Sequence, residues 1–225
     1  AETTLLKLTS AYSVFVNGGK LVEPILIDRI QDSEGKTVFN NDKRKCVNCD
    51  EISYLGEDYP IIKDDYKKIF SPQTSYQMTS ILEGVVQRGT AKKLKDLKLD
   101  IAGKTGTTNK NTDTWFVGYT SNLLIGVYVG LDNPSPLGRY ETGSKTALPI
   151  FKEFVKKTVN KSDARPFKAA EGTVMMVVDP NTGQKAKFNS KNTIIEVYKE
   201  QNVIDGKVLY SNNDRLDSNN ILKFY

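Results

Sequence analysis

The chain has 225 residues, which is long enough for one sizeable domain or two small ones. Hydrophobic residues make up 38% and charged residues 26%, and this balance is typical of a folded globular protein. The formal net charge is +5, but basic and acidic residues alternate along the chain, which favours a solvated, mildly basic surface over a nucleic-acid-binding one. No stretch reaches the roughly 18 apolar residues of a membrane span. The sequence has no histidine, which excludes Ser-His-Asp and Cys-His catalytic arrangements and imidazole metal sites.

The first third of the chain predicts a helix, a hairpin and a long loop. Apolar residues at helical spacing predict a helix over residues 3–15, which ends at Asn17-Gly18-Gly19. Residues 24–30 and 37–39 have the character of two strands joined by a Gly-containing turn. Residues 40–67 are polar, charged and irregular, and we interpret them as a surface insertion.

The second predicted helix has both a start signal and a stop signal. Ser71 suits the N-cap, Pro72 suits the first helical position, and Gly89 is the expected C-terminal stop. Residues 91–97 predict a short further helical turn. The apolar residues expected to face the core are Met78, Ile81, Leu82, Val85 and Val86.

Three strands are predicted next, at residues 99–107, 114–120 and 123–131. The two-residue Ser121-Asn122 connection makes the last two an antiparallel hairpin. The third strand is an almost continuous run of Val, Ile, Leu and Tyr, as expected for a strand that is buried on both faces.

A helix over residues 145–159 follows, with Pro149 expected in its first turn because a later proline would kink it. Its predicted inward residues are Leu148, Ile150, Phe151, Phe154 and Val155. The character of the sequence changes near residue 162. Residues 164–167 have the character of a linker, short strands are predicted at 173–178, 194–198 and 208–210, and 179–183 is a strong turn signal.

The first of the three central strands carries the tripeptide Lys104-Thr105-Gly106, followed by Thr107. Alternation along a strand puts Lys104 and Gly106 on one face, and Thr105 and Thr107 on the other. Gly103 and Gly106 remove side-chain bulk, so that another backbone can approach closely. Taken alone, the tripeptide is weak evidence, since a surface strand with a lysine on it fits equally well.

The tripeptide is embedded in a much longer pattern. The segments that carry it are 85–91, 102–108, 113–120, 126–132 and 141–143, together with 11–19. This pattern resembles the transpeptidase domain of class A penicillin-binding proteins, the bifunctional cell-wall synthases, and K-T-G is a known signature of serine β-lactamases and penicillin-binding proteins. The resemblance covers roughly residues 1–185 and is most specific over 70–160.

The resemblance implies an α/β fold of the α+β type, with an antiparallel sheet flanked by helices as in serine β-lactamases and DD-transpeptidases, incomplete in this chain. Residues 1–165 would form the C-terminal portion of the transpeptidase domain, and 166–225 a C-terminal extension. An unfinished sheet would leave an exposed edge and apolar surface, so we expect the isolated chain to self-associate or to need the upstream part of the same protein.

The resemblance also implies roles for the residues of the strand. Lys104 would supply positive potential, and the hydroxyls of Thr105 and Thr107, flanking Gly106, would bind the terminal carboxylate of a D-Ala-D-Ala stem peptide or of a β-lactam. The backbone N–H of Thr107 would contribute to an oxyanion hole. No metal and no cofactor is implied.

The nucleophile of the family, a serine in a Ser-x-x-Lys motif at a helix start, and the Ser-x-Asn loop that follows it are expected outside this chain. One segment, 33–36, matches the first pattern, but it lies in a predicted turn where its lysine has no reason to be desolvated. Segments 190–192, 211–213 and 218–220 match the second pattern, but they follow the K-T-G strand and lie in a turn-rich tail. We interpret all four as chance matches in solvated loops.

The resemblance implies part of a peptidoglycan DD-transpeptidase, which crosslinks stem peptides by acyl transfer and binds penicillin on the periplasmic side of the bacterial inner membrane. The parent protein would also carry a glycosyltransferase domain and the membrane anchor, and this chain alone would be inactive. Two alternatives remain: a hydrolase of the DD-carboxypeptidase or β-lactamase type, and a non-catalytic module that only binds the peptide.

Other notable residues lie outside the tripeptide. Cys46 and Cys49 form a C-x-x-C, for which a local disulfide is favoured over free thiols or a metal, because the chain has no other cysteine and no histidine. For Trp115 core packing is favoured over a place at the cleft, and for Asp113 a structural role is favoured. The segment 139–143 is expected near the cleft rim.

Overall fold

The structure is a computed structural model that describes residues 3–42, 44–47, 49, 61–63, 66–162, 164–204 and 207–208. The elements in chain order are α1 (Leu5–Val16), β1 (Arg29–Gln31), β2 (Thr37–Asn40), β3 (Lys45–Val47), β4 (Ile61–Lys63), α2 (Pro72–Gln87), η1 (Lys92–Leu97), β5 (Ala102–Thr107), η2 (Asn109–Asn111), β6 (Asp113–Tyr119), β7 (Leu124–Gly130), α3 (Ala147–Thr158), β8 (Thr173–Val178), β9 (Ile194–Lys199), η3 (Glu200–Asn202), β10 (Val203–Ile204) and β11 (Lys207–Val208).

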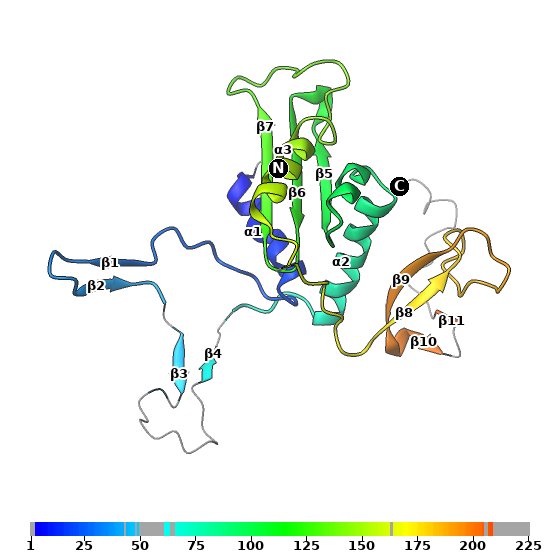
Figure 1. The fold of residues 1–225 in the computed structure, drawn as a ribbon, viewed down its shortest axis with the longest axis horizontal. Coiled ribbons are helices and arrows are strands. Elements are labelled where there is room, and N and C mark those ends of the chain that lie inside the picture. Colours follow the sequence, from blue (N-terminus) through cyan, green and yellow to red (C-terminus); the bar gives the residue numbers. More distant parts are fainter. Residues whose placement is uncertain are drawn as a thin grey trace.

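The centre of the molecule is an antiparallel three-stranded sheet in the order β5-β6-β7, with helices around it (Figure 1). Helix α3 covers one face, where the rings of Phe116 and Phe151 meet edge to face with centroids 4.7 Å apart. Helix α1 covers the opposite face over β7, so closely that a side chain on Gly126 would collide with Thr9. Helix α2 packs beside β5. The predicted α/β fold, an antiparallel sheet flanked by helices, is confirmed.

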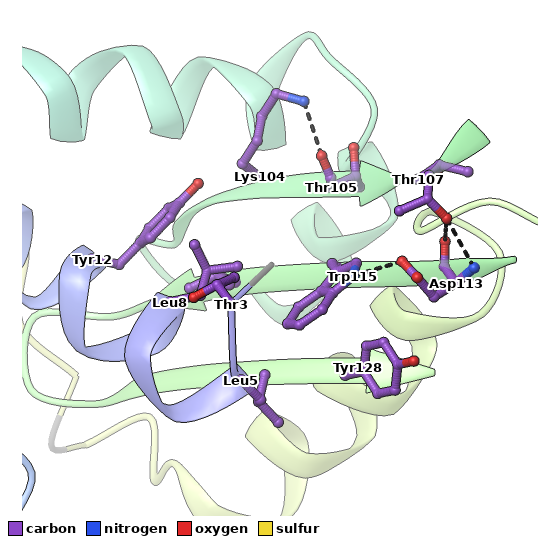
Figure 2. Close-up of a pocket in the computed structure, with 13 residues that line it drawn as sticks. Thr3, Leu5, Leu8, Tyr12, Lys104, Thr105, Thr107, Asp113, Trp115 and Tyr128 are labelled. Carbon is purple, nitrogen blue, oxygen red and sulfur yellow. Dashed lines mark hydrogen bonds between the residues drawn. The ribbon is translucent and has the colours of Figure 1, made fainter. Parts of the chain in front are cut away.

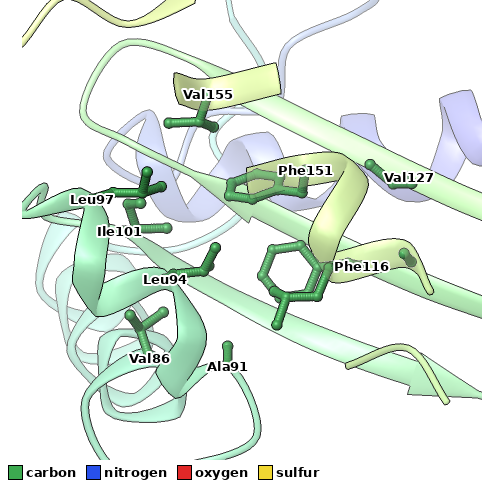
Figure 3. Close-up of a cluster of buried hydrophobic side chains, with 11 residues drawn as sticks. Val86, Ala91, Leu94, Leu97, Ile101, Phe116, Val127, Phe151 and Val155 are labelled. Atoms are coloured by element: carbon green, nitrogen blue, oxygen red, sulfur yellow. The ribbon is translucent and has the colours of Figure 1, made fainter. Parts of the chain in front are cut away.

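The main hydrophobic core lies between the sheet, α3 and the segment that joins α2 to β5 (Figure 3). Its buried members are Val86, Ala91, Leu94, Leu97, Ile101, Phe116, Val127, Ala147, Leu148, Phe151 and Val155. Each large apolar side chain that is fully buried here contributes about 1.5–3 kcal/mol relative to exposure. This core therefore fixes β5 and β6 relative to the ends of α2 and α3.

The local signals in the sequence predicted most of these elements. The hydroxyl of Ser71 accepts the N–H of Thr74 and caps α2, and Pro72 is the first helical residue, as predicted. The β6–β7 hairpin turns through residues 121–122, and Pro149 lies in the first turn of α3. Because these signals act over a few residues, they do not depend on the rest of the fold.

Three predictions about burial are wrong. Strand β7 is not buried on both faces, since Tyr128 is 42% exposed, and the central, most buried strand is β6. Ile81, Ile150 and Phe154, which were expected to face the core, are exposed by 42%, 53% and 48%. On α2 Leu82 and Val86 are buried as predicted, but the other buried residues are Ser75, Thr79 and Gly84, so the buried face includes two hydroxyls.

An arm formed by β1 to β4 extends away from the sheet and its helices (Figure 1). The first predicted strand is shorter than expected and begins at Arg29, because residues 24–28 have no regular structure. Within the predicted irregular insertion, β3 and β4 pair as an antiparallel ladder, so that expectation is wrong for these strands. Cys46 and Cys49 are joined by a disulfide, with their Cα atoms 5.7 Å apart, as favoured from the sequence.

The chain after α3 forms a small β unit that packs on α2 (Figure 1). Strands β8 and β9 pair in register from Thr173–Lys199 to Val178–Ile194, and β10 pairs with β11. The Nε2 atom of Gln77 donates to the carbonyl of Val197 at 3.0 Å. Arg88 forms an ion pair with Glu196 at 2.7 Å. The predicted strand at 208–210 corresponds in part to β11, and residues 209–225 lie outside the described residues.

Candidate functional site

The pairing of β5 with β6 decides which side chains share a face. Lys104 pairs with Val117 and Gly106 pairs with Trp115, so these residues share the face toward α1. Thr105 pairs with the fully buried Phe116, and these point to the opposite side. The alternation predicted for β5 is therefore the observed one.

A cavity of about 700 Å³ lies between α1 and this face of the sheet (Figure 2). Three strands and one helix contribute to it. The residues that line it are Thr3, Leu5, Leu8, Tyr12, Lys104, Thr105, Gly106, Thr107, Thr108, Asp113, Trp115, Val117 and Tyr128. The whole segment 104–107 thus borders an open groove with an apolar floor. Burial raises the pKa of Tyr12 above its ordinary value.

Lys104 supplies the positive charge of this groove. Its Nζ donates to the carbonyl oxygen of Thr105 at 3.0 Å, and its side chain is exposed. None of the ion pairs among the described residues involves Lys104. Its charge is therefore not neutralised locally, and it is available to an anionic group in the groove.

The hydroxyl of Thr107 is held by a loop that precedes α3. Its Oγ1 accepts the backbone N–H of Gly143 at 3.1 Å. A hydroxyl that accepts one hydrogen bond keeps its own proton to donate. Gly143 packs directly on the sheet, because a Cβ at this position would lie 2.5 Å from the carbonyl oxygen of Trp115 and 2.6 Å from that of Gly106. This close approach depends on Gly143 itself, because the missing side chain of Gly106 faces Trp115, whose Cβ would lie 3.1 Å from a Cβ at Gly106. No residue of segment 139–143 lines the groove, so its place at the rim stays a prediction.

The hydroxyl of Thr105 has a different partner. Its Oγ1 lies 2.9 Å from the Oγ1 of Thr90, which belongs to the turn after α2. Thr90 falls within one of the segments that carry the family resemblance, but no role was predicted for it from the sequence. The two residues are 15 positions apart, and only the packing of α2 beside β5 brings them together.

Trp115 and Asp113 form the wall of the groove near the start of β6 (Figure 2). The indole Nε1 donates to Oδ1 of Asp113 at 2.7 Å, and the indole ring meets Tyr128 at 4.6 Å between centroids. The expectation that Trp115 packs in the core is wrong, because alternation along β6 directs Phe116 to the core and Trp115 to the groove. Asp113 orients the indole, which agrees with the structural role favoured for it.

Two of the four short matches to the Ser-x-x-Lys and Ser-x-Asn patterns lie among the described residues, and both are in turns or loops. Ser33 is exposed in the turn between β1 and β2. Ser190 lies in a loop, where its Oγ accepts the N–H of Lys187 at 3.1 Å. Segments 211–213 and 218–220 lie outside the described residues.

The described part of the chain contains no group of three or more His, Cys, Asp or Glu residues placed to hold a metal ion. No described helix combines the length and the apolar character needed to cross a bilayer.

Comparison with known proteins identifies close counterparts. The family described as penicillin binding protein transpeptidase domain matches residues 1–156. Penicillin-binding protein 1A of Rickettsia felis is 38% identical over 221 residues, which are 96% of this chain and 28% of that protein. Its counterpart in Pseudomonas aeruginosa is 30% identical over 89% of this chain and 28% of its own length.

A solved structure of a relative has a similar fold. The crystal structure of penicillin-binding protein 1A from Haemophilus influenzae superimposes with a TM-score of 0.70 at 30% identity, over 88% of this chain and 32% of that one. The chain therefore spans between a quarter and a third of the length of these relatives.

Proposed function

This chain belongs to the penicillin-binding protein transpeptidase family, and on that premise we propose that β5 is the strand that binds the peptide's terminal carboxylate in a peptidoglycan DD-transpeptidase. The observation that carries the proposal is the edge of the groove. Lys104, which has no acidic partner among the described residues, lines this groove together with Thr107, whose hydroxyl accepts the N–H of Gly143 and keeps its own proton to donate. A carboxylate is a pure acceptor, so a cation and hydroxyl donors are complementary to it.

The residues have separate roles in the proposed reaction. Lys104 attracts the carboxylate of a D-Ala-D-Ala stem peptide or of a β-lactam, and the hydroxyls of Thr105 and Thr107 fix it by hydrogen bonds. Gly106 has no side chain that would press on Trp115, and it leaves room for the peptide. The N–H of Thr107 stabilises the oxyanion formed when the acyl carbon is attacked, and one such donor contributes about 3–4 kcal/mol to transition-state stabilisation.

In this proposal the acylated serine and its lysine base come from another part of the same protein. The acyl group passes from the D-Ala-D-Ala donor to the serine with release of D-alanine, and then to the amine of a second stem peptide. The glycosyltransferase domain and membrane anchor are proposed for the length of the relatives that this chain does not span, with the reaction on the periplasmic side of the inner membrane. The domain boundary near residue 165 is likewise a proposal.

The transpeptidase is preferred to a DD-carboxypeptidase or β-lactamase because the relatives that match almost the whole chain are penicillin-binding proteins 1A. A module that only binds peptide would share the same groove. Covalent labelling by fluorescent penicillin separates the transpeptidase from the module that only binds peptide. The complete protein should label at a serine outside this chain, and this chain alone should not label. Labelling at Ser33 would contradict the assignment.

The binding role can be tested on this chain directly. N-acetyl-D-alanyl-D-alanine should shift the amide NMR signals of residues 104–107, whereas the same peptide with a C-terminal amide should shift them only at higher concentration, because it binds more weakly. Lys104→Met should weaken binding of the acid, and Lys157→Met, which removes an exposed lysine on α3, should leave it unchanged. Equal binding of acid and amide would refute the proposed role of β5.

Self-association remains a prediction. Among the described residues, β7 pairs with β6 on one side and with no strand on the other. An open edge of this kind favours pairing with another chain. A monodisperse monomer in light scattering would contradict the prediction.

A further inference from the structure

Each of the two threonine hydroxyls of β5 has a partner from outside the strand. Thr107 accepts the N–H of Gly143, which can only donate. Thr105 meets another hydroxyl, that of Thr90, at 2.9 Å, and in this pair either oxygen can be the donor. The direction of the second hydrogen bond decides whether Thr105 still has a proton to offer to a ligand.

The turn that carries Thr90 is held on both sides. Ala91 is fully buried in the main core, and its N–H bonds to the carbonyl of Val85 at 3.0 Å. On the other side, the N–H of Arg88 bonds to the carbonyl of Gly84 at 2.8 Å, and its guanidinium pairs with Glu196. The backbone of Thr90 is therefore fixed beside β5, although its own side chain is exposed and does not line the groove.

A carboxylate in the groove would select one direction for the hydrogen bond between the two hydroxyls. Because the carboxylate accepts only, Thr105 must donate its single hydroxyl proton to it. The oxygen of Thr105 is then an acceptor for the proton of Thr90, and the two hydrogen bonds run in the same direction. Hydrogen bonds in such a chain polarise and strengthen each other.

We propose that Thr90 is a positioning residue, which donates to Thr105 and so directs the hydroxyl of Thr105 toward the terminal carboxylate of the peptide. This inference rests on the proposed function of β5. It adds to that function a residue outside the K-T-G strand, in the turn between α2 and η1. Thr90 does not itself touch the carboxylate in this arrangement.

The test compares two ligands on three forms of the 225-residue chain. The ligands are N-acetyl-D-alanyl-D-alanine and its C-terminal amide, titrated with detection by amide NMR signals of β5. Thr90→Val keeps the branched shape and removes the hydroxyl, whereas Thr90→Ser keeps the hydroxyl. The valine variant should weaken binding of the acid about threefold to tenfold and leave the amide unaffected. The serine variant should bind the acid like the wild type.

A purely structural role for Thr90 predicts other results. It predicts that valine and serine weaken binding alike, or that acid and amide are affected equally, and either result would overturn the inference. Thr90→Val should have no further effect in a Thr105→Val background, and an undiminished effect there would also overturn it. Thr90→Ala serves in place of the valine variant if that one does not fold. If the wild-type chain shows no preference for the acid, the proposed function of β5 fails, and the inference fails with it.

Discussion

Gly143→Ala should displace the loop before α3 from the edge of the sheet. A Cβ at Gly143 would lie 2.5 Å from the carbonyl oxygen of Trp115, whereas ordinary contact begins at 3.4 Å, so the two backbones must separate by about 0.9 Å. The N–H of Gly143 is 3.1 Å from Oγ1 of Thr107. A shift of that size along this direction lengthens the distance to about 4 Å, beyond the range of a hydrogen bond.

The substitution should therefore have two effects. Overpacking a closed contact costs about 1–3 kcal/mol, and losing a partly buried hydrogen bond costs about 0.5–1.5 kcal/mol. Urea unfolding should show a loss of about 2–4 kcal/mol in the free energy of unfolding. Binding of N-acetyl-D-alanyl-D-alanine should weaken as well, because the hydroxyl of Thr107 is no longer held in its orientation.

Gly18→Ala is the matched control. Gly18 has a φ of +60°, and no heavy atom lies within 4 Å of the position that a methyl group would take, so alanine there meets only backbone strain of about 1–2 kcal/mol. It should lower the free energy of unfolding without changing affinity for the acid. The reasoning would be refuted if Gly143→Ala had wild-type stability and wild-type affinity, or if both variants weakened binding equally.

Three further predictions concern other parts of the molecule. Burial, with a smaller contribution from the nearby carboxylate of Asp100, raises the pKa of Glu83 from 4.5 to about 7. Between these two pH values the folded chain holds a proton that the unfolded chain has released, so the free energy of unfolding should fall as pH rises from about 4.5 to 7. Glu83→Gln should flatten this dependence. Glu196→Gln removes the pairing with Arg88 and should speed amide hydrogen exchange in β9, with a loss of about 1 kcal/mol. Asp113→Ala releases the indole of Trp115, the only tryptophan, and should shift its fluorescence to the red.

Controls and contrary outcomes are available for each. A pH dependence of stability that is the same in wild type and Glu83→Gln would contradict the assignment to Glu83. Asp96→Asn breaks a pair with Lys152 in which the carboxylate is 76% exposed, and it should have a smaller effect than Glu196→Gln. Unchanged emission in Asp113→Ala would show that the carboxylate does not orient the indole.

The sequence was most informative where structure depends on neighbouring residues. The capping signal at Ser71 and the two-residue turn at 121–122 each specify a local geometry, and both elements were predicted. Burial is harder to predict, because hydrophobicity alone does not decide the inward face of α2. Thr79 is buried there since its hydroxyl bonds to the hydroxyl of Tyr119 at 3.0 Å and to the carbonyl of Phe15 at 3.2 Å. A polar residue with such partners is as suited to the interior as an apolar one.

In the groove, too, contacts between distant parts of the chain could not be predicted from the sequence. The K-T-G tripeptide and its alternation could be predicted, because they lie within a single strand. The partners of its hydroxyls could not, since Thr90 is 15 residues and Gly143 is 36 residues from the threonine that each contacts. Only the positions of α2 and α3 against the sheet bring these residues to β5. The prediction of core packing for Trp115 is wrong for a related reason, because the position of α3 decides which side of β6 faces the core.

The two partners of β5 are held by one and the same core. Thr90 immediately precedes Ala91, and the carbonyl of Gly143 accepts the N–H of Leu148 at 2.8 Å. Ala91 and Leu148 are both fully buried in the cluster around Phe116 and Phe151. That cluster lies on the side of the sheet opposite the groove and lines none of it, yet it sets the distance from β5 to both partners. Core packing on one face of the sheet therefore determines how the hydroxyl groups at its edge are oriented.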